Sequence, residues 1–247
     1  MGFRFFFVSL QPVFNTTMFR NCFLIIMLLL IKSSLGFAQT MDWGLWTSVG
    51  AEKRLSKDWE MEAVFGNYVF VDETSDVNQI RTGLIATRSF ADNFNVGAGY
   101  LFIARYGQDI SRYRNRYFVQ PMVRYRFSRF QIDYRTRLEL TFRGMRNETI
   151  GMFDHQNTRW LSRNRFRVRY TTKDGQFRPY THFETFHRLF RGWEGSYHEN
   201  RFTVGTIYRM NKYHNFDFAY RLETDVDSGG QVIHRRNYVV VAYVYVF

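Results

Sequence analysis

Charged side chains recur at every second position of one segment, FQIDYRTRLELTFR at residues 130–143. The odd-numbered positions include Asp133, Arg135, Arg137 and Glu139. Aromatic or aliphatic side chains occupy most of the even-numbered positions between them. Because successive side chains of a β-strand point to opposite faces, this pattern predicts a strand with one ionic face and one apolar face. Arginine and carboxylate groups sharing a face have the chemistry to form bidentate ion pairs.

The same ionic face recurs along much of the chain, and we predict that it forms one network of ion pairs. The expected members are Arg124, Asp133, Arg135, Arg137, Glu139, Arg163, Arg165, His182, Glu184, Arg201, Arg209, Asp217, Arg221 and Glu223. Pairing through the expected turns places Arg124 opposite Asp133, Glu139 opposite Arg163, and Arg209 opposite Asp217. It also places Glu184 near Arg163 and Thr203, with Arg201 on a diagonal. Cross-strand neighbours about 5 Å apart are within reach of these side chains.

One pair of residues within this set is half of a catalytic constellation. His182 and Glu184 share a face of RPYTHFETFHRLF, and an acid that orients a histidine is part of a hydrolytic triad. No nucleophile accompanies them, so we expect a structural histidine and a protein that is not an enzyme. A barrel-embedded lipid-modifying enzyme is the alternative. The spacings give no metal signature and no phosphate-binding loop, so neither metal nor cofactor is expected.

Alternation predicts long strands and no helix, since no window keeps the 3.6-residue period over three turns. The expected strands are 43–55, 59–70, 78–90, 94–106, 116–127, 130–143, 159–170, 177–190, 197–209, 216–225 and 235–247. Most have the length of a tilted membrane-spanning strand, about 9–11 residues or more. The count of eleven conflicts with the even number usual in bacterial single-chain barrels, so ten to twelve strands are expected.

The connections alternate in length, as they do in outer-membrane barrels. Short turns are expected at 56–58, 91–93, 128–129, 171–176 and 210–215. Longer polar loops are expected at 71–77, 107–115, 144–158, 191–196 and 226–234.

The first 38 residues have the features of a secretory signal peptide. FLIIMLLLI at 23–31 follows Arg20, and Gly36 and Ala38 form a plausible cleavage site before Gln39. Nine apolar residues are too few for a spanning helix, which needs about 20. Cleavage would remove the chain's single cysteine, Cys22, and lower the net charge from +12 to +9.

An exported protein with these strands presents its apolar face to lipid. In hydrocarbon every backbone polar group needs a partner within the protein, which a sheet achieves only by closing into a barrel. We therefore predict one domain at 39–247, an all-β, transmembrane, antiparallel up-and-down barrel of the bacterial outer-membrane type. Its ionic face lines the lumen, where the network either closes the barrel or leaves a narrow passage for anions and small solutes. A soluble periplasmic barrel that binds an apolar ligand is the remaining alternative.

Partners follow from the same features. The terminal strand NYVVVAYVYVF, ending at Phe247, resembles the signal read by the barrel-assembly machinery. Five arginines lie near the expected external loops, namely Arg112, Arg114, Arg143, Arg146 and Arg191. We expect them to pair with phosphates of outer-membrane lipid, including lipopolysaccharide. The arginines alternate through strands instead of clustering in a stripe, so nucleic acid is not an expected partner.

Several segments resemble one bacterial outer-membrane family, catalogued as domain of unknown function 2490. They are DWGLWTSVGAEKRLSKDWEMEAV, NRFRVRYTTKDGQFRPYTHFETF and the aromatic terminal strand, and the resemblance covers roughly residues 42–247. It implies a small outer-membrane barrel and assigns no activity and no functional residue.

Overall fold

In the computed structural model, the chain forms a closed all-β barrel. The structure describes residues 41–71, 78–106, 110–147, 153–189, 197–226 and 232–247, so the predicted signal peptide lies outside the described part. The strands found there are β1 (Met41–Arg54), β2 (Trp59–Val71), β3 (Asn78–Ala91), β4 (Phe94–Tyr106), β5 (Ile110–Phe127), β6 (Phe130–Asn147), β7 (Phe153–Tyr170), β8 (Phe177–Leu189), β9 (Tyr197–Arg209), β10 (His214–Val226) and β11 (Val232–Val246). No helix among these residues is long and apolar enough to cross a membrane.

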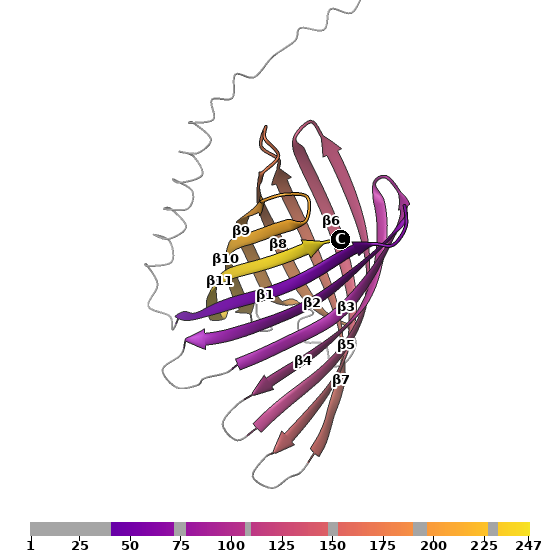
Figure 1. Ribbon diagram of the computed structural model, residues 1–247. Helices are drawn as coiled ribbons and strands as arrows, with labels where there is room; N and C mark the ends of the chain where they lie inside the picture. Colours follow the sequence, from indigo (N-terminus) through magenta and orange to yellow (C-terminus); the bar gives the residue numbers. More distant parts are fainter. Residues whose placement is uncertain (1–40, 72–77, 107–109, 148–152, 190–196, 227–231) are drawn as a thin grey trace, which may run out of the picture. The chain divides into compact units, whose positions relative to one another are not determined.

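Each strand is hydrogen-bonded to its neighbours in chain order, and β1 closes the barrel against β11. Figure 1 shows β1 lying between β2 and β11. The consecutive pairs are antiparallel, but β1 and β11 are parallel, with Met41 opposite Arg235 and Glu52 opposite Val246. The closed all-β barrel is therefore confirmed, while the expectation of wholly antiparallel pairing is wrong at this one seam.

The parallel seam also settles the strand count. When consecutive strands alternate in direction, an odd number leaves the first and last strands running the same way. Eleven strands in the described part of the chain thus require a parallel closure, and all eleven predicted segments belong to the wall. The conflict with an even count was resolved by the closure and not by a missing or surplus strand.

Three strands begin or end well beyond their predicted bounds. β5 starts at Ile110 instead of 116, β6 continues to Asn147 instead of 143, and β7 starts at Phe153 instead of 159. These extensions are polar, and polar residues were expected to be loops. In a barrel with an ionic interior, however, inward positions remain polar while the strand continues.

Turns at one end of the barrel are short and held by local hydrogen bonds. Between β7 and β8, the Thr172 hydroxyl and the Gln176 amide donate to the Asp174 carboxylate, which lowers the pKa of that carboxyl. Gly175 in this turn has a φ of 71°, a conformation that glycine adopts without steric cost. Between β9 and β10, the Asn211 side chain accepts from the Tyr213 and His214 amides.

Burial shows which face is inside. On β6 the side chains of Asp133, Arg135 and Glu139 are 0%, 7% and 1% exposed, whereas Tyr134 and Leu138 are 49% and 46% exposed. The other strands repeat this arrangement, with half-exposed aromatic and aliphatic side chains outside. The structure therefore confirms the outer-membrane type of barrel, with an apolar outer wall around an ionic interior.

Candidate functional site in the barrel lumen

Asp133 is the centre of one buried cluster. Arg124 Nε of β5 donates to Asp133 Oδ1 at 2.9 Å, and Arg167 of β7 donates to Oδ2 from Nε at 2.9 Å and Nη2 at 2.6 Å. The Gln131 amide adds bonds of 2.8 and 3.0 Å to the two oxygens. Both arginines stand opposite Asp133 in the strand register. One carboxylate therefore joins three adjacent strands.

Glu184 of β8 is the centre of a second cluster, nearer the middle of the barrel. Arg135 Nη2 donates to its Oε1 at 2.9 Å, and Arg163 donates to its Oε2 from Nη2 at 2.6 Å and Nε at 3.2 Å. Glu184 is 1% exposed. Charge-assisted bonds of this kind are the strong class of hydrogen bond, and here they connect β6, β7 and β8.

Glu139 extends this cluster toward the end with the longer connections. Its carboxylate lies 3.3 Å from Arg116 Nη1, 3.7 Å from Arg137 Nη1 and 3.9 Å from Arg163 Nη1. Arg163 is shared between Glu139 and Glu184. Arg137 also donates to Gln120 Oε1 at 2.6 and 2.8 Å, and its guanidinium lies 4.0 Å from the centre of the Phe118 ring.

A third cluster lies on β9 and β10. Arg201 Nε is 2.5 Å from Glu199 Oε1 and 2.9 Å from Glu223 Oε1. Arg221 Nη1 is 4.0 Å from Glu223, its Nε donates to the Thr203 hydroxyl at 3.3 Å, and its guanidinium lies 4.0 Å from the centre of the Trp46 ring. The Trp46 contact connects this cluster to β1.

Several expected pairs have other partners. Glu139 is opposite Leu161, and Arg137 is opposite Arg163, so the predicted Glu139–Arg163 register is wrong, although the two side chains meet diagonally. Asp217 is opposite Ile207, not Arg209. These corrections share a cause, because the actual register differs by two residues, and a shift of two keeps each side chain on its face while changing its partner.

The displaced residues have identifiable environments. Asp217 accepts a hydrogen bond from the Tyr180 hydroxyl at 2.9 Å, and Arg209 donates to the backbone of Asn211 in the turn. Thr203 is opposite His182, while Arg201 stands directly opposite Glu184 and not on a diagonal. Among the residues that the structure describes, Arg209 thus forms no ion pair with the network, and Asp217 is bonded to Tyr180, whose ring stacks on His182.

Arg165 lines the lumen without an acidic partner. It stands opposite Glu184 in the register, yet both Glu184 oxygens are occupied by Arg135 and Arg163. Across the described ranges Arg165 has no ion pair, and its buried Nε has no hydrogen-bond partner. Arg178, nearer the short turns, likewise has no ion pair among the described residues, and its buried Nε has no hydrogen-bond partner.

The His182 environment does not assemble a catalytic constellation. Its ring stacks on Tyr180 with centroids 5.8 Å apart, and its Nδ1 has no hydrogen-bond partner in the described part of the chain. Glu184 is held by arginines and does not orient the ring. Within the same residues, no group of three or more His, Cys, Asp or Glu side chains is arranged to hold a metal ion.

Between the short turns and the Glu184 and Glu139 clusters, here called the central clusters, the lumen opens into a cavity of about 960 Å³. It extends from the exposed turn residues Lys57, Asp58 and Asp92 to buried Arg163 and Glu184. Thirteen of its lining residues are Arg or Lys and seven are Asp or Glu. The strands β5–β8 supply most of the arginines, whereas β1 and β2, across the barrel, supply three glutamates, Glu52, Glu60 and Glu62.

A family model described as "Protein of unknown function (DUF2490)" matches residues 43–233. The chain belongs to this family. The predicted resemblance is therefore confirmed for most of the barrel. A search of curated proteins found no match to the chain.

Solved structures similar to this DUF2490 barrel include a porin and two autotransporter domains. The NanC porin is 12% identical, with 79% of this chain and 93% of the porin covered at a TM-score of 0.46. The β domain of the Bordetella autotransporter BrkA is 13% identical, with 76% and 82% covered at 0.49. The translocator domain of the autotransporter NalP from Neisseria meningitidis is 12% identical, with 84% and 91% covered at 0.43.

The predicted ion-pair network omits four polar members of the DUF2490 lumen. Arg167 and Gln131 complete the Asp133 cluster, and Arg116 and Gln120 complete the Glu139 and Arg137 environments. Alternation carries the signal for all four, since each lies an even number of positions from a predicted member on its own strand. Arg116 was passed over because β5 was expected to begin there.

Proposed function

We propose that this protein is an integral, non-enzymatic barrel of the bacterial outer membrane whose narrow lumen passes small anions. The apolar wall supports the membrane location. Phe166, Phe183 and Phe218 are 49%, 45% and 48% exposed on the outside, and lipid is the solvent that favours such a surface. A soluble barrel holding an apolar ligand would need the opposite arrangement, an apolar interior.

The excess of cationic groups along the cavity carries the proposal of anion passage. Arg165 and Arg178 face the cavity without a carboxylate partner among the residues that the structure describes. A lumen lined by one predominant sign of charge concentrates ions of the opposite sign. Rings of arginine and lysine are the usual selectivity device of anion pores.

The central clusters restrict what passes. Four side chains from the three strands β6, β7 and β8 converge there and are buried. They are Arg137, Glu139, Arg163 and Glu184. Side chains that fill a small barrel leave no wide aqueous channel. Chloride-sized anions are therefore expected to pass slowly, and sugars or peptides are expected to be excluded.

The absence of enzymatic activity is supported by the His182 environment. A general base needs an orienting partner and a nucleophile within about 3 Å, and the nearest acid, Glu184, is engaged by two arginines. We expect that neither the wild-type protein nor His182→Ala modifies lipid substrates.

Two partners are part of the proposal. The barrel-assembly machinery would read the terminal strand before folding, and in the folded barrel the Phe247 amide donates to the Glu52 carbonyl at 2.8 Å. Outer-membrane lipid, including lipopolysaccharide, would surround the aromatic wall. Export through the predicted signal peptide at residues 1–38 supplies the route.

The test is the reversal potential of the purified protein in a planar bilayer under a KCl gradient. We expect small current steps with a reversal potential that favours chloride, and a weaker preference in Arg165→Gln/Arg178→Gln. Arg88→Gln is the control for a lost charge outside the lumen, because Arg88 is exposed on the outside beside Trp59 and Phe90. Cation preference, a large unselective conductance or no current would each refute anion passage.

A further inference from the structure

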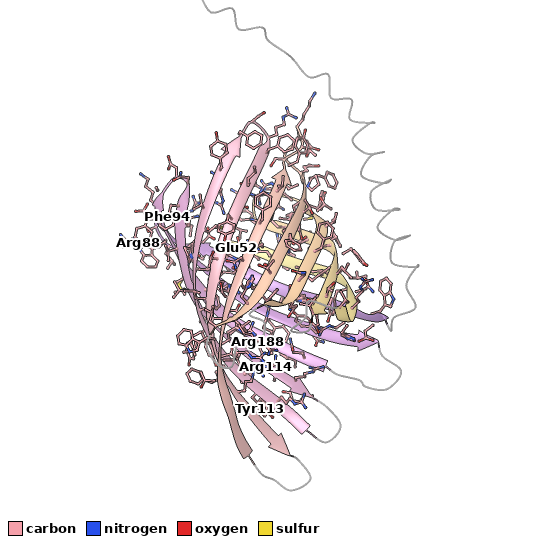
Figure 2. The ribbon with its side chains drawn as sticks, turned by 180° about the vertical axis from the view of Figure 1, so that it is seen from behind. Glu52, Arg88, Phe94, Tyr113, Arg114 and Arg188 are labelled. Atoms are coloured by element: carbon pink, nitrogen blue, oxygen red, sulfur yellow. The ribbon has the colours of Figure 1, made fainter. Side chains whose placement is uncertain are left out.

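A second group of arginines gathers at the end of the barrel with the longer connections. It consists of Arg112 and Arg114 of β5, Arg143 of β6, Arg159 of β7 and Arg188 of β8, here called the mouth arginines. Figure 2 shows Arg114 and Arg188 toward this end of the barrel, while Arg88 and Phe94 lie toward the other. The lining of the 960 Å³ cavity includes none of the five.

Strand alternation places the mouth arginines on the inner face. Arg114 is four positions from Phe118, Arg188 is two from Phe186, and Arg159 is two from Leu161. Those three apolar residues are only 4–6% exposed, and they point into the barrel. On β6, the buried Thr141 and the exposed Phe142 precede Arg143, which continues the inward set. The side chain of Arg146 and the whole of Arg191 lie outside the described residues.

Like charges face each other at this end of the barrel. Arg114 stands directly opposite Arg143 across the β5–β6 pair, and Arg112 stands opposite Arg105 of β4. Side chains directly opposite on one face lie about 5 Å apart, and like charges in that position are destabilising. The strand register thus brings cations together here instead of separating them.

In the described part of the chain, the mouth arginines have no carboxylate as an ion-pair partner. None of the five is ion-paired within the ranges that the structure describes, and the nearest inward acid along β6, Glu139, is bound by Arg116, Arg137 and Arg163. Elsewhere in this lumen, buried arginines cluster around Asp133, Glu184 or Glu223. A converging group of guanidinium groups that lacks its own acid has the composition of an anion-binding site.

We propose that the mouth arginines bind a multiply charged oxyanion of the phosphate class. Phosphate offers several acceptor oxygens, so one group can bridge facing guanidinium groups, which a carboxylate with two oxygens does less well. Arg112 and Arg114 are two positions apart, about 7 Å along the strand. The long arginine side chains of these two steps can converge on two phosphate groups joined in one molecule.

The phosphate belongs either to a soluble compound entering the mouth or to a lipid headgroup reaching over the rim. Both sources present the same chemistry to the same side chains, and the inward direction of the arginines favours the soluble one. The site does not depend on anion passage, because it would bind its ligand whether or not the central clusters conduct.

The experiment is calorimetric titration of the full-length mature barrel in detergent with inorganic pyrophosphate, at an ionic strength of about 0.15 M where weak surface attraction is screened. We expect saturable binding that is weakened at least tenfold in Arg114→Gln/Arg143→Gln. Arg88→Gln, which removes one positive charge from the outer face, should bind as the wild type does. Pyrophosphate should also raise the unfolding midpoint of the wild type but not of the double variant.

A second arm distinguishes the sources. Calorimetric titration of the same detergent-solubilised barrel with micelles containing a bis-phosphorylated lipid, compared with micelles of zwitterionic lipid alone, tests the headgroup. Binding of that lipid without pyrophosphate binding, lost in the double variant, would assign the phosphate to the membrane. Equal binding by the double variant and the wild type, or no binding of either phosphate compound, would overturn the proposal.

Discussion

Each buried carboxylate of the lumen is shared by more than one arginine. Asp133 binds Arg124 and Arg167, and Glu184 binds Arg135 and Arg163. A buried ion pair gains little over an apolar pair of the same shape, because desolvation offsets the attraction. Removing one partner is costly, however, since the remaining charges stay buried without compensation.

Asp133→Asn tests this reasoning at a single residue. The change retains the size and the contact with Gln131 but leaves the guanidinium groups of Arg124 and Arg167 without an anion, so we expect a loss of about 3 kcal/mol in the free energy of unfolding. Urea titration of the barrel in lipid vesicles, followed by tryptophan fluorescence, measures it.

Asp217→Asn is the matched control. Asp217 is bonded to the Tyr180 hydroxyl and to no arginine in the described part of the chain, and an asparagine oxygen can still accept that bond. We expect a loss below about 1 kcal/mol. Equal losses of unfolding free energy in the two variants would show that ion pairing does not account for the stabilising effect of Asp133.

At the residue scale the sequence predicts faces well and partners poorly. Alternation alone places Arg135, Glu139 and Glu184 inside, because the side-chain period of a strand is two. Partners depend on register. The turn before β10 is shorter than expected, since Asn211 caps it and His214 already belongs to the strand, and this displaces Asp217 from Arg209 by two residues.

At the element scale, the position of each strand was predictable, whereas the exact strand count and the strand ends were not. All eleven segments were found, because each alternates over ten or more residues. The extensions of β5, β6 and β7 are not predicted, because a polar composition is also typical of loops. The parallel closure of β1 on β11 has no local signal at all, since it follows only from the odd number of strands.

A disulfide between β1 and β11 tests the parallel closure. Ser48 is opposite Ala242 on the inner face, so Ser48→Cys/Ala242→Cys should cross-link on oxidation. The chain's single cysteine, Cys22, lies in the predicted signal peptide and adds no thiol after cleavage. Non-reducing electrophoresis or mass spectrometry detects the bond.

Ser48→Cys/Val246→Cys is the control for this register. Val246 lies four positions farther along β11, opposite Glu52, so its distance from Ser48 is about 13 Å, beyond disulfide range. Cross-linking of this pair in preference to the other would mean that the two strands are not aligned as the structure has them.

At the scale of the whole molecule, the barrel reverses the polarity of a soluble protein. Charged residues such as Asp133, Glu139 and Glu184 are almost wholly buried, while aromatic residues such as Tyr125 are up to 64% exposed. Closure of the sheet pairs the backbone groups of neighbouring strands, which is what a sheet surrounded by hydrocarbon requires. The anion passage and the mouth site both depend on this arrangement, because both place arginines around the lumen.

Photolabelling from the bilayer tests that arrangement most directly. The barrel is reconstituted in vesicles whose acyl chains carry a photoactivatable carbene precursor, and the modified residues are located by mass spectrometry. Tyr134 and Phe166, each 49% exposed, should take the label, whereas their strand neighbours Arg135 and Arg165 should remain unmodified. Labelling of Arg135 and Arg165 with Tyr134 and Phe166 spared would contradict the account.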